Sequence, residues 1–223
     1  MSRPWIRPLW VLLVMWWVPL GWAAEPQDVP KAEATPHAAV VRLQAFVDGI
    51  TTMEATFIQR VRSNDSTEIE ESRGRFLALR PGKFRWDYES PEVQHIVCDG
   101  KTVWLHEPEL QQVTRISADR LDRAPAAFLV SKSRIAESFF TKVVHNEKLD
   151  LDTVFLSPKA EAAHFKEVAI TLDKSGQEIQ FFQVTDTLGN RSYFQFVGMR
   201  MNQRVDESRF EFQIPKGADL IEG

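Results

Sequence analysis

The sequence predicts a mainly β protein. In it, an antiparallel meander of ten or so strands curls into a barrel or partial barrel, with helices at the start and in the middle of the chain. Short apolar–polar alternations follow one another, separated by turn signals such as Asp99-Gly100, and do not alternate with helical segments. All 15 phenylalanines lie beyond residue 23, against 2 tyrosines. The domain therefore has large apolar surface for a solid core or an apolar cavity.

The first 23 residues have the pattern of a cleaved secretory signal peptide. Arg3 and Arg7 make the start positive, a run of mostly Leu, Val and Trp follows, and Gly21 and Ala23 are the small residues expected before a cut. The apolar run is too short and too close to the cleavage signal to predict a permanent membrane span. We therefore expect export to the periplasm, with cleavage after Ala23.

Residues 24–36 predict a disordered arm, because Pro26, Pro30 and Pro36 are mixed with small and charged residues. Residue 24 is alanine, whereas a lipid anchor at the cleavage site requires a cysteine there. We therefore expect an unanchored, soluble product. Residues 37–223 are then a single domain, long enough for a core of its own.

A helix is predicted to follow the arm. Thr35 suits the capping position, Pro36 suits the first helical position, and Gly49 suits the C-terminal end. Apolar residues recur at three- and four-residue spacing and form one broad face of this helix. They are Val40, Leu43, Phe46, Val47 and Ile50.

After that helix the chain is mostly strands, with helical patterns only near residues 125–130 and 133–139. The predicted strands are residues 53–61, 75–80, 84–88, 93–98, 102–106, 141–146, 149–156, 167–172, 178–185, 192–197 and 210–214. Turn residues separate several of them, as at Ser175-Gly176 and Leu188-Gly189-Asn190. Strands joined by short turns pair antiparallel, which is why a meander is expected.

An Arg-Pro-Gly turn that begins at Arg80 joins two of these strands. Its proline favours extended geometry at Arg80 and so places that residue at the end of a strand. Phe84, Trp86 and Tyr88 form one side of the next strand. A charged side chain close to such apolar surface must find partners. An ordinary hairpin with an exposed arginine is the alternative interpretation.

Composition and motifs argue against nucleic-acid binding, metal binding and catalysis. Without Arg3 and Arg7 the chain has 25 basic against 31 acidic residues, and its formal charge changes from −4 to −6. Nucleic-acid binding favours the opposite sign. The single cysteine, Cys98, excludes an intramolecular disulfide. It lies three positions after His95 within a strand, so the two side chains face opposite sides and form no catalytic pair. We expect neither an enzyme nor a cofactor.

A series of short motifs runs in order through nearly the whole chain beyond residue 36. They are Ala55-Thr56-Phe57-Ile58-Gln59, Gly74-Arg75-Phe76-Leu77, Arg80-Pro81-Gly82-Lys83-Phe84-Arg85-Trp86, Asp99-Gly100-Lys101-Thr102-Val103-Trp104, Pro125…Phe128-Leu129, Leu156-Ser157-Pro158-Lys159 and Phe210-Glu211-Phe212-Gln213-Ile214-Pro215-Lys216-Gly217. Behind a cleavable signal, this series resembles the LolA family, the periplasmic carriers of outer-membrane lipoproteins. The sequence departs from the family pattern in its longer proline-rich arm and in His106, where a tyrosine is usual.

The resemblance implies an incomplete (half) β-barrel of about ten or eleven antiparallel strands with an α-helical lid over an apolar cavity. The cavity is expected to shield the acyl chains of lipoproteins. An ATP-driven complex of the inner membrane would release these lipoproteins to the carrier, which would deliver them to an outer-membrane acceptor. The carrier is expected to be a monomer.

By the same resemblance, Arg80 latches the lid through hydrogen bonds to carbonyls near Phe128–Ser131. Phe84 matches a position near the mouth of the cavity that matters for loading and transfer. The other candidates for contact with acyl chains are Leu43, Phe46, Phe57, Trp86, Trp104, Phe128 and Leu129. Plain core packing is the alternative role for the first five of these.

Two other functions stay open from the residues alone. One is a lipocalin-like periplasmic binder of a free lipid. The other is a related half-barrel acceptor or envelope-stress sensor that binds lipoproteins without shuttling them. An acceptor is normally lipid-anchored, and the alanine at position 24 argues against it.

Overall fold

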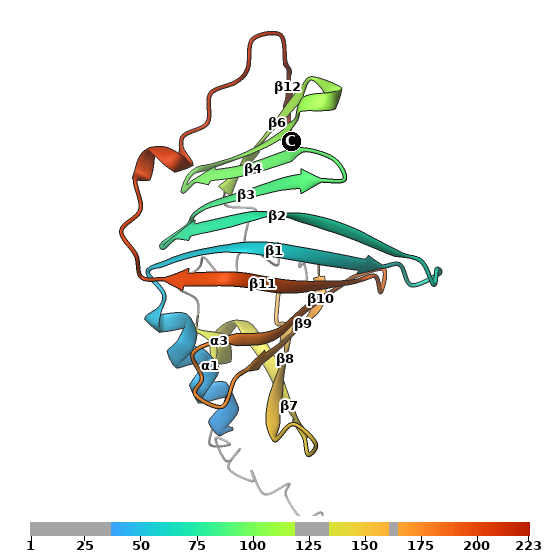
Figure 1. Ribbon diagram of the computed structural model, residues 1–223, viewed down its shortest axis with the longest axis vertical. Helices are drawn as coiled ribbons and strands as arrows, with labels where there is room; N and C mark the ends of the chain where they lie inside the picture. The colour runs from blue at the N-terminus through green and yellow to red at the C-terminus, as the bar shows by residue number, and fades with distance from the viewer. Residues whose placement is uncertain (1–36, 119–133, 161–164) are drawn as a thin grey trace, which may run out of the picture. The chain divides into compact units, whose positions relative to one another are not determined.

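The computed structural model describes residues 37–118, 134–160 and 165–223. Its strands form one 12-stranded sheet in the order β12-β6-β5-β4-β3-β2-β1-β11-β10-β9-β8-β7 (Figure 1). The strands are β1 (Thr52–Arg62), β2 (Ile69–Leu79), β3 (Lys83–Ser90), β4 (Gln94–Asp99), β5 (Thr102–Glu107), β6 (Gln112–Ser117), β7 (Phe139–Asn146), β8 (Leu151–Pro158), β9 (Phe165–Leu172), β10 (Ile179–Asp186), β11 (Arg191–Met201) and β12 (Asp219–Glu222). The predicted mainly β fold is confirmed as an open sheet that does not close into a barrel.

The sheet consists of two antiparallel meanders, β1 to β6 and β7 to β11, joined along their long strands. β1 pairs with β11 in the middle of the sheet, where Phe57 is opposite Phe196, and β1 pairs with β2 on its other side, where Phe57 is opposite Gly74 (Figure 1). Only β12 is parallel to its neighbour, β6. Local turns specify the meanders, whereas the β1–β11 pair joins residues far apart in the chain.

Two of the observed strands were not predicted, and one predicted strand is absent. These are β6 and β12, and the shorter of them, β12, pairs with β6 far away in the sequence, so no local turn indicates it. Residues 210–214, predicted as a strand, instead follow the 3-10 helix η3 (Glu207–Phe210) as irregular chain. A second 3-10 helix, η1 (Pro108–Leu110), separates β5 from β6.

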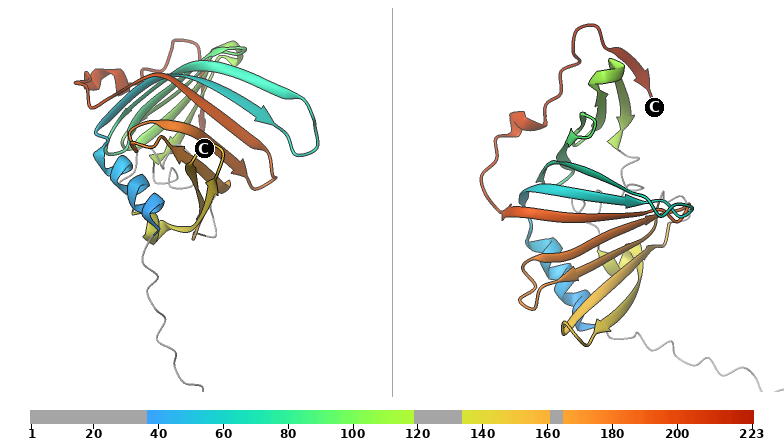
Figure 2. Two further views of the ribbon diagram at one scale, coloured as in Figure 1. Left: turned by 60° about the horizontal axis from the view of Figure 1, so that its bottom comes forward. Right: turned by 45° about the vertical axis from the view of Figure 1, so that its right-hand side comes forward.

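Helix α1 (Ala38–Gly49) lies on the inner face of the sheet, the face around which the strands curve (Figure 2). The helix ends at Gly49 as predicted. It begins at Ala38, where the ring nitrogen of His37 accepts a capping bond from the Ala39 amide at 3.2 Å, whereas the predicted positions Thr35 and Pro36 lie outside the described residues. Helix α3 (Ile135–Ser138) lies inside the predicted segment 133–139. Within the described residues, no helix is long and apolar enough to cross a membrane.

Several predicted segments lie outside the described residues: the signal peptide 1–23, the arm 24–36 and the helical pattern at 125–130.

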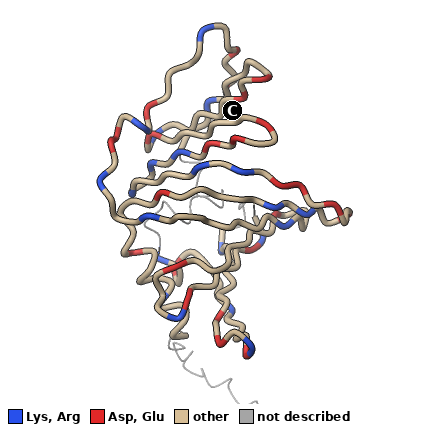
Figure 3. The backbone as a smooth tube through the Cα atoms, viewed as in Figure 1, with Lys and Arg blue, Asp and Glu red and all other residues tan. Residues whose placement is uncertain are grey.

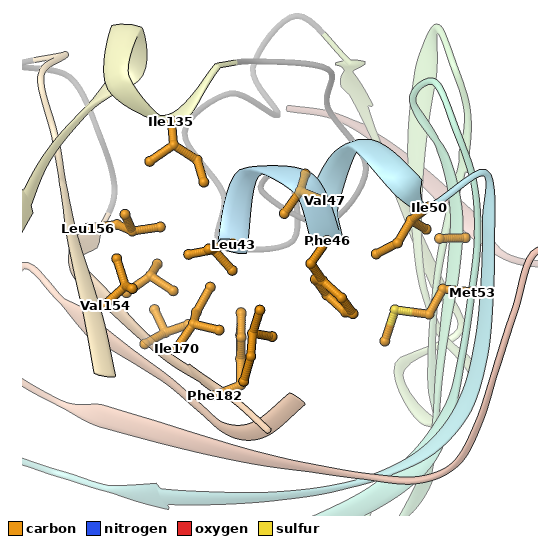
Figure 4. Packing of buried hydrophobic residues seen from close by; sticks show 14 of the residues in the cluster. Leu43, Phe46, Val47, Ile50, Met53, Ile135, Val154, Leu156, Ile170 and Phe182 are labelled. Atoms are coloured by element: carbon orange, nitrogen blue, oxygen red, sulfur yellow. The ribbon is translucent and has the colours of Figure 1, made fainter. Parts of the chain in front are cut away.

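The core is one apolar cluster between the inner face, α1 and α3. Residues of α1 meet those of β8, β9 and β10, and Ile135 of α3 closes the cluster from one side (Figure 4). Figure 4 labels Leu43, Phe46, Val47, Ile50, Met53, Ile135, Val154, Leu156, Ile170 and Phe182. Along most strands, alternate side chains point to this cluster, so the apolar alternation of the sequence becomes one continuous surface.

The outer face of the sheet is covered in part by the segment after β11. Phe210 is buried there together with Val97 of β4 and Val113 of β6. Arg209 of η3 bonds Glu54 of β1 at 2.9 Å and holds the segment against the sheet. Basic and acidic residues are interspersed along the strands (Figure 3), and several pair across this face.

Gly74 is expected to be intolerant of any side chain. A Cβ atom at this position would lie 1.9 Å from the backbone oxygen of Asp87 and 3.0 Å from the ring of Phe57. Gly74→Ala should therefore lower the free energy of unfolding by about 3 kcal/mol or prevent folding, because the rigid backbone of β3 must move. Denaturant unfolding measures this change.

Gly49→Ala is the matched control. A Cβ atom at Gly49 meets nothing within 4 Å, so the same substitution should change the stability by no more than about 1 kcal/mol. Equal stability losses in the two variants would contradict the close approach at Gly74.

Candidate functional site

Large aromatic side chains form a connected surface on the inner face. Trp86 lies near its centre, with ring centroids 4.6 Å from Phe76, 5.1 Å from Phe57 and 5.4 Å from Phe194. Phe194 continues the surface to Phe182 of β10 at 5.7 Å. Five strands, β1, β2, β3, β10 and β11, therefore contribute to one aromatic surface. Such a surface suits contact with hydrocarbon and offers little to a polar ligand.

The aromatic surface becomes polar at one end. The Tyr88 hydroxyl donates to the side-chain oxygen of Gln59 at 2.7 Å, and the amide nitrogen of Gln59 donates to the Ser192 hydroxyl at 3.4 Å. Burial raises the pKa of Tyr88 to about 12, so its hydroxyl remains a protonated donor at any physiological pH. Along β1 and β3 the inner face therefore changes from apolar near α1 to hydrogen-bonding farther along the strands.

Helix α1 covers the other half of the inner face, and polar contacts fix it at its sides. Arg42 forms an ion pair with Asp152 of β8 at 3.0 Å. The side-chain oxygen of Gln44 accepts from the Ile135 amide at 2.8 Å and so ties α1 to α3. The apolar face of α1 is buried between these contacts, with Leu43 1% exposed.

Arg80 joins the C-terminal end of α1 to the turn between β2 and β3. Its Nη1 donates to the carbonyl of Val47 and, at 3.4 Å, to the carbonyl of Ile50. The last carbonyls of a helix have no partner within the helix, so a cation there supplies both a donor and a favourable charge. Burial lowers the pKa of Arg80, and the charge of Asp48 opposes this change. The exposed-hairpin interpretation of Arg80 is therefore wrong.

Asn202 is a second clamp at the same helix end, and sequence reasoning missed it. Its amide nitrogen donates to the Gly49 carbonyl at 2.9 Å, and its side-chain oxygen accepts from the Thr51 amide at 2.8 Å. Asn202 has a φ of +58°, the left-handed conformation that asparagine tolerates better than most residues. An asparagine directly after a long strand was the available signal, but its partner is about 150 positions away in the sequence.

The structure brings five of the predicted contact residues into one cluster and separates one from them. The five that meet are Leu43, Phe46, Phe57, Phe84 and Trp86. Trp104 instead lies on the outer face, opposite Val97 in the pairing of β4 with β5, and stacks on Phe212 with centroids 5.6 Å apart. Phe128 and Leu129, and the carbonyls near them that Arg80 was expected to bind, lie outside the described residues.

Phe84 is more buried than the mouth of a cavity would require. It is 2% exposed and lies on the inner face of β3, one inner position before Trp86. A charged replacement would therefore place a carboxylate in the core. Milder substitutions are needed to test its role.

Two histidines of the sheet and its cysteine lie on different faces. His95 bonds Asp87 at 2.7 Å and stacks on His106 on the outer face, while Cys98 is buried in the inner cluster. The predicted separation of His95 from Cys98 is confirmed. Among the described residues, no group of three or more His, Cys, Asp or Glu side chains is arranged to hold a metal ion.

Known proteins match this chain over most of its length. The family model of the outer membrane lipoprotein carrier protein LolA matches residues 48–213. An outer-membrane lipoprotein carrier protein from Chromobacterium violaceum is 35% identical over 219 residues, covering 98% of this chain and 100% of its own length. The protein of that name from Azotobacter vinelandii is 34% identical over 186 residues, covering 82% and 88%. The crystal structure of an uncharacterized conserved protein from Thermus thermophilus has the same fold, with a TM-score of 0.53, 14% identity and coverage of 84% and 100%.

Arg80→Leu should loosen α1 from the sheet. Loss of charge-assisted bonds to the helix end should lower the free energy of unfolding by about 1.5–3 kcal/mol and expose apolar surface. Hydrophobic-dye binding and denaturant unfolding measure the two effects. Arg80→Lys should restore only part of the stability, because an ammonium group does not reproduce the planar fork of arginine.

Asn202→Gly is the control for this helix end. It removes the second clamp while accepting the same backbone conformation. The Asn202→Gly variant should bind less dye than the Arg80→Leu variant, because hydrogen bonds between neutral groups are weaker than those of a charged group. If Arg80→Leu binds no extra dye and unfolds like the wild type, Arg80 does not hold the helix.

Proposed function

This chain belongs to the LolA family of outer-membrane lipoprotein carrier proteins, and we propose that it shields lipoprotein acyl chains against the aromatic inner face of its sheet. The connected surface around Trp86 is the observation that supports this assignment most directly. Phe57 and Phe76 are fully buried within this surface, and their rings have no polar group that contact with hydrocarbon would leave unsatisfied once the cover is displaced.

The energetics of lipid transfer explain why such a carrier needs partners at both ends of its route. Each buried CH₂ group of a lipid chain is worth about 0.8 kcal/mol, so extraction from a membrane is far too costly to occur unaided. We propose that an ATP-driven complex of the inner membrane supplies this energy and that an outer-membrane acceptor receives the cargo. The carrier itself then only prevents the chains from meeting water.

The clamp at Arg80 has a role in this cycle. An empty apolar surface open to water is unfavourable, so the unloaded carrier should be covered, and α1 is held over the inner face by Arg80 and Asn202. Binding of acyl chains must displace part of this cover. Closure of the empty form then favours release of the cargo to the acceptor, since the clamp bonds form again.

The ligand that copurifies with the protein should be an acylated lipoprotein. Protein isolated gently from periplasm and measured by native mass spectrometry should retain covalently acylated polypeptides, because the aromatic surface shields their chains. A free lipid in their place would favour the lipocalin-like binder. Metabolic labelling with palmitate should label the cargo and not the carrier, and a labelled carrier would support an anchored acceptor.

Phe84→Leu should impair loading and transfer beyond its effect on stability. Leucine keeps the site apolar, so the free energy of unfolding should fall by no more than about 1.5 kcal/mol. Transfer of a labelled lipoprotein from purified carrier to acceptor measures the functional effect, which we expect as a several-fold slower handover.

Phe165→Leu is the matched control for Phe84→Leu. Phe165 is 4% exposed in the same cluster but packs against Phe139, at 6.4 Å, beside β7 and away from the aromatic surface. It should lose similar stability and transfer cargo normally. Equal transfer by the two variants would assign Phe84 to the core alone.

A further inference from the structure

The indole nitrogen of Trp86 is a buried hydrogen-bond donor that has no partner in the described part of the chain. The Trp86 Nε1–H is shielded from solvent and donates to no acceptor among the residues that the structure describes. The residue is 6% exposed, at the centre of the aromatic surface. A buried N–H without an acceptor costs about 1–3 kcal/mol, so this donor weakens the empty protein.

The residues around Trp86 show that purely apolar aromatic rings fit this part of the inner face. Phe76, Phe57 and Phe194 surround Trp86 and fill comparable positions on neighbouring strands without any polar atom. The other polar aromatic residue of this surface, Tyr88, has its acceptor in Gln59 at 2.7 Å. Trp86 thus differs from its neighbours in presenting a donor that the protein leaves unused.

We propose that the Trp86 Nε1–H donates a hydrogen bond to an acyl carbonyl oxygen of the bound lipid, at the linkage that joins an acyl chain to the rest of the lipoprotein. This inference rests on the proposed function. An acyl carbonyl is only an acceptor, so it complements a lone donor. Loading would then satisfy two groups that otherwise remain unpaired, the indole nitrogen and the carbonyl taken out of water.

The position of Trp86 agrees with such a linkage. On the inner face of β3, Trp86 lies between Phe84, toward the α1 end, and Tyr88, which begins the polar end with Gln59. An esterified acyl chain has the same order of groups: its hydrocarbon lies on one side of the carbonyl, and the polar part of the lipoprotein lies on the other. The chain would extend toward Phe84 and the polar part toward Tyr88.

Two lipopeptide probes test the proposal on the wild-type protein. One is a diacylglyceryl-cysteine peptide with two ester linkages and a free amino end, and the other is its dialkyl ether counterpart, which lacks both carbonyls. We expect the ester probe to bind about threefold to tenfold more tightly, the range of one hydrogen bond. A third probe, with ether chains and an N-acyl amide, shows whether an amide carbonyl substitutes for the ester.

Trp86→Phe should remove this discrimination, with the ratio of ester to ether affinity falling to about one. Trp104→Phe is the matched control, because it makes the same change on the outer face and should keep the wild-type ratio. Tyr88→Phe should also keep it, since the Tyr88 hydroxyl already has a partner. A ratio that persists in Trp86→Phe would overturn the proposal.

The proton resonance of the Trp86 indole N–H gives a readout that needs no Trp86 variant. It should shift downfield when the ester probe binds and not when the ether probe binds. This measurement decides the proposal if Trp86→Phe fails to fold. Equal binding of the ester, ether and amide probes with unshifted indole resonances would overturn the role of Trp86 and leave the carrier function intact. Failure of the wild type to bind any probe would instead overturn the proposed function.

Discussion

The structure depends on how the last carbonyls of α1 are satisfied. The helix covers an apolar face that would otherwise meet water, and its C-terminal end lies where the β2–β3 turn and the end of β11 come together. Arg80 from the turn and Asn202 from the end of β11 both bond these carbonyls. Because the last carbonyls of a helix lack intrahelical amide partners, these two side chains add bonds that fix the end of α1 to the sheet. In the cycle that we propose, these bonds hold the empty form closed and are broken when cargo binds.

An open sheet has the further advantage that its two faces can serve different purposes. Alternation along each strand sends Phe84 and Trp86 to the inner face and Arg85 and Asp87 to the outer face. The outer face is stabilised by ion pairs and by the C-terminal segment around Phe210. The inner face can therefore exchange its contents, a helix side or a lipid, while the strands remain paired.

The aromatic surface combines hydrocarbon contact with a few directed polar groups. Phenylalanines supply area, the Tyr88–Gln59 pair marks one end, and the indole of Trp86 places a donor between them. A uniformly apolar surface would bind any chain in any position. A single hydrogen-bond donor within the aromatic surface can define how far an acyl chain enters, because each chain has its carbonyl at one place.

The sequence by itself determined the local features of this protein. Alternation and turn residues predicted an antiparallel meander, Gly49 predicted the end of α1, and the Arg-Pro-Gly turn placed Arg80 at a strand end. Only the tertiary structure decided which carbonyls Arg80 binds, that Asn202 shares the task, and that Trp104 faces outward. Local patterns depend on neighbouring residues and can be recognised from the sequence alone. The face of a strand and the pairing of β1 with β11 depend on contacts between residues far apart in the chain, and a shift of one residue in register exchanges every inner side chain for an outer one.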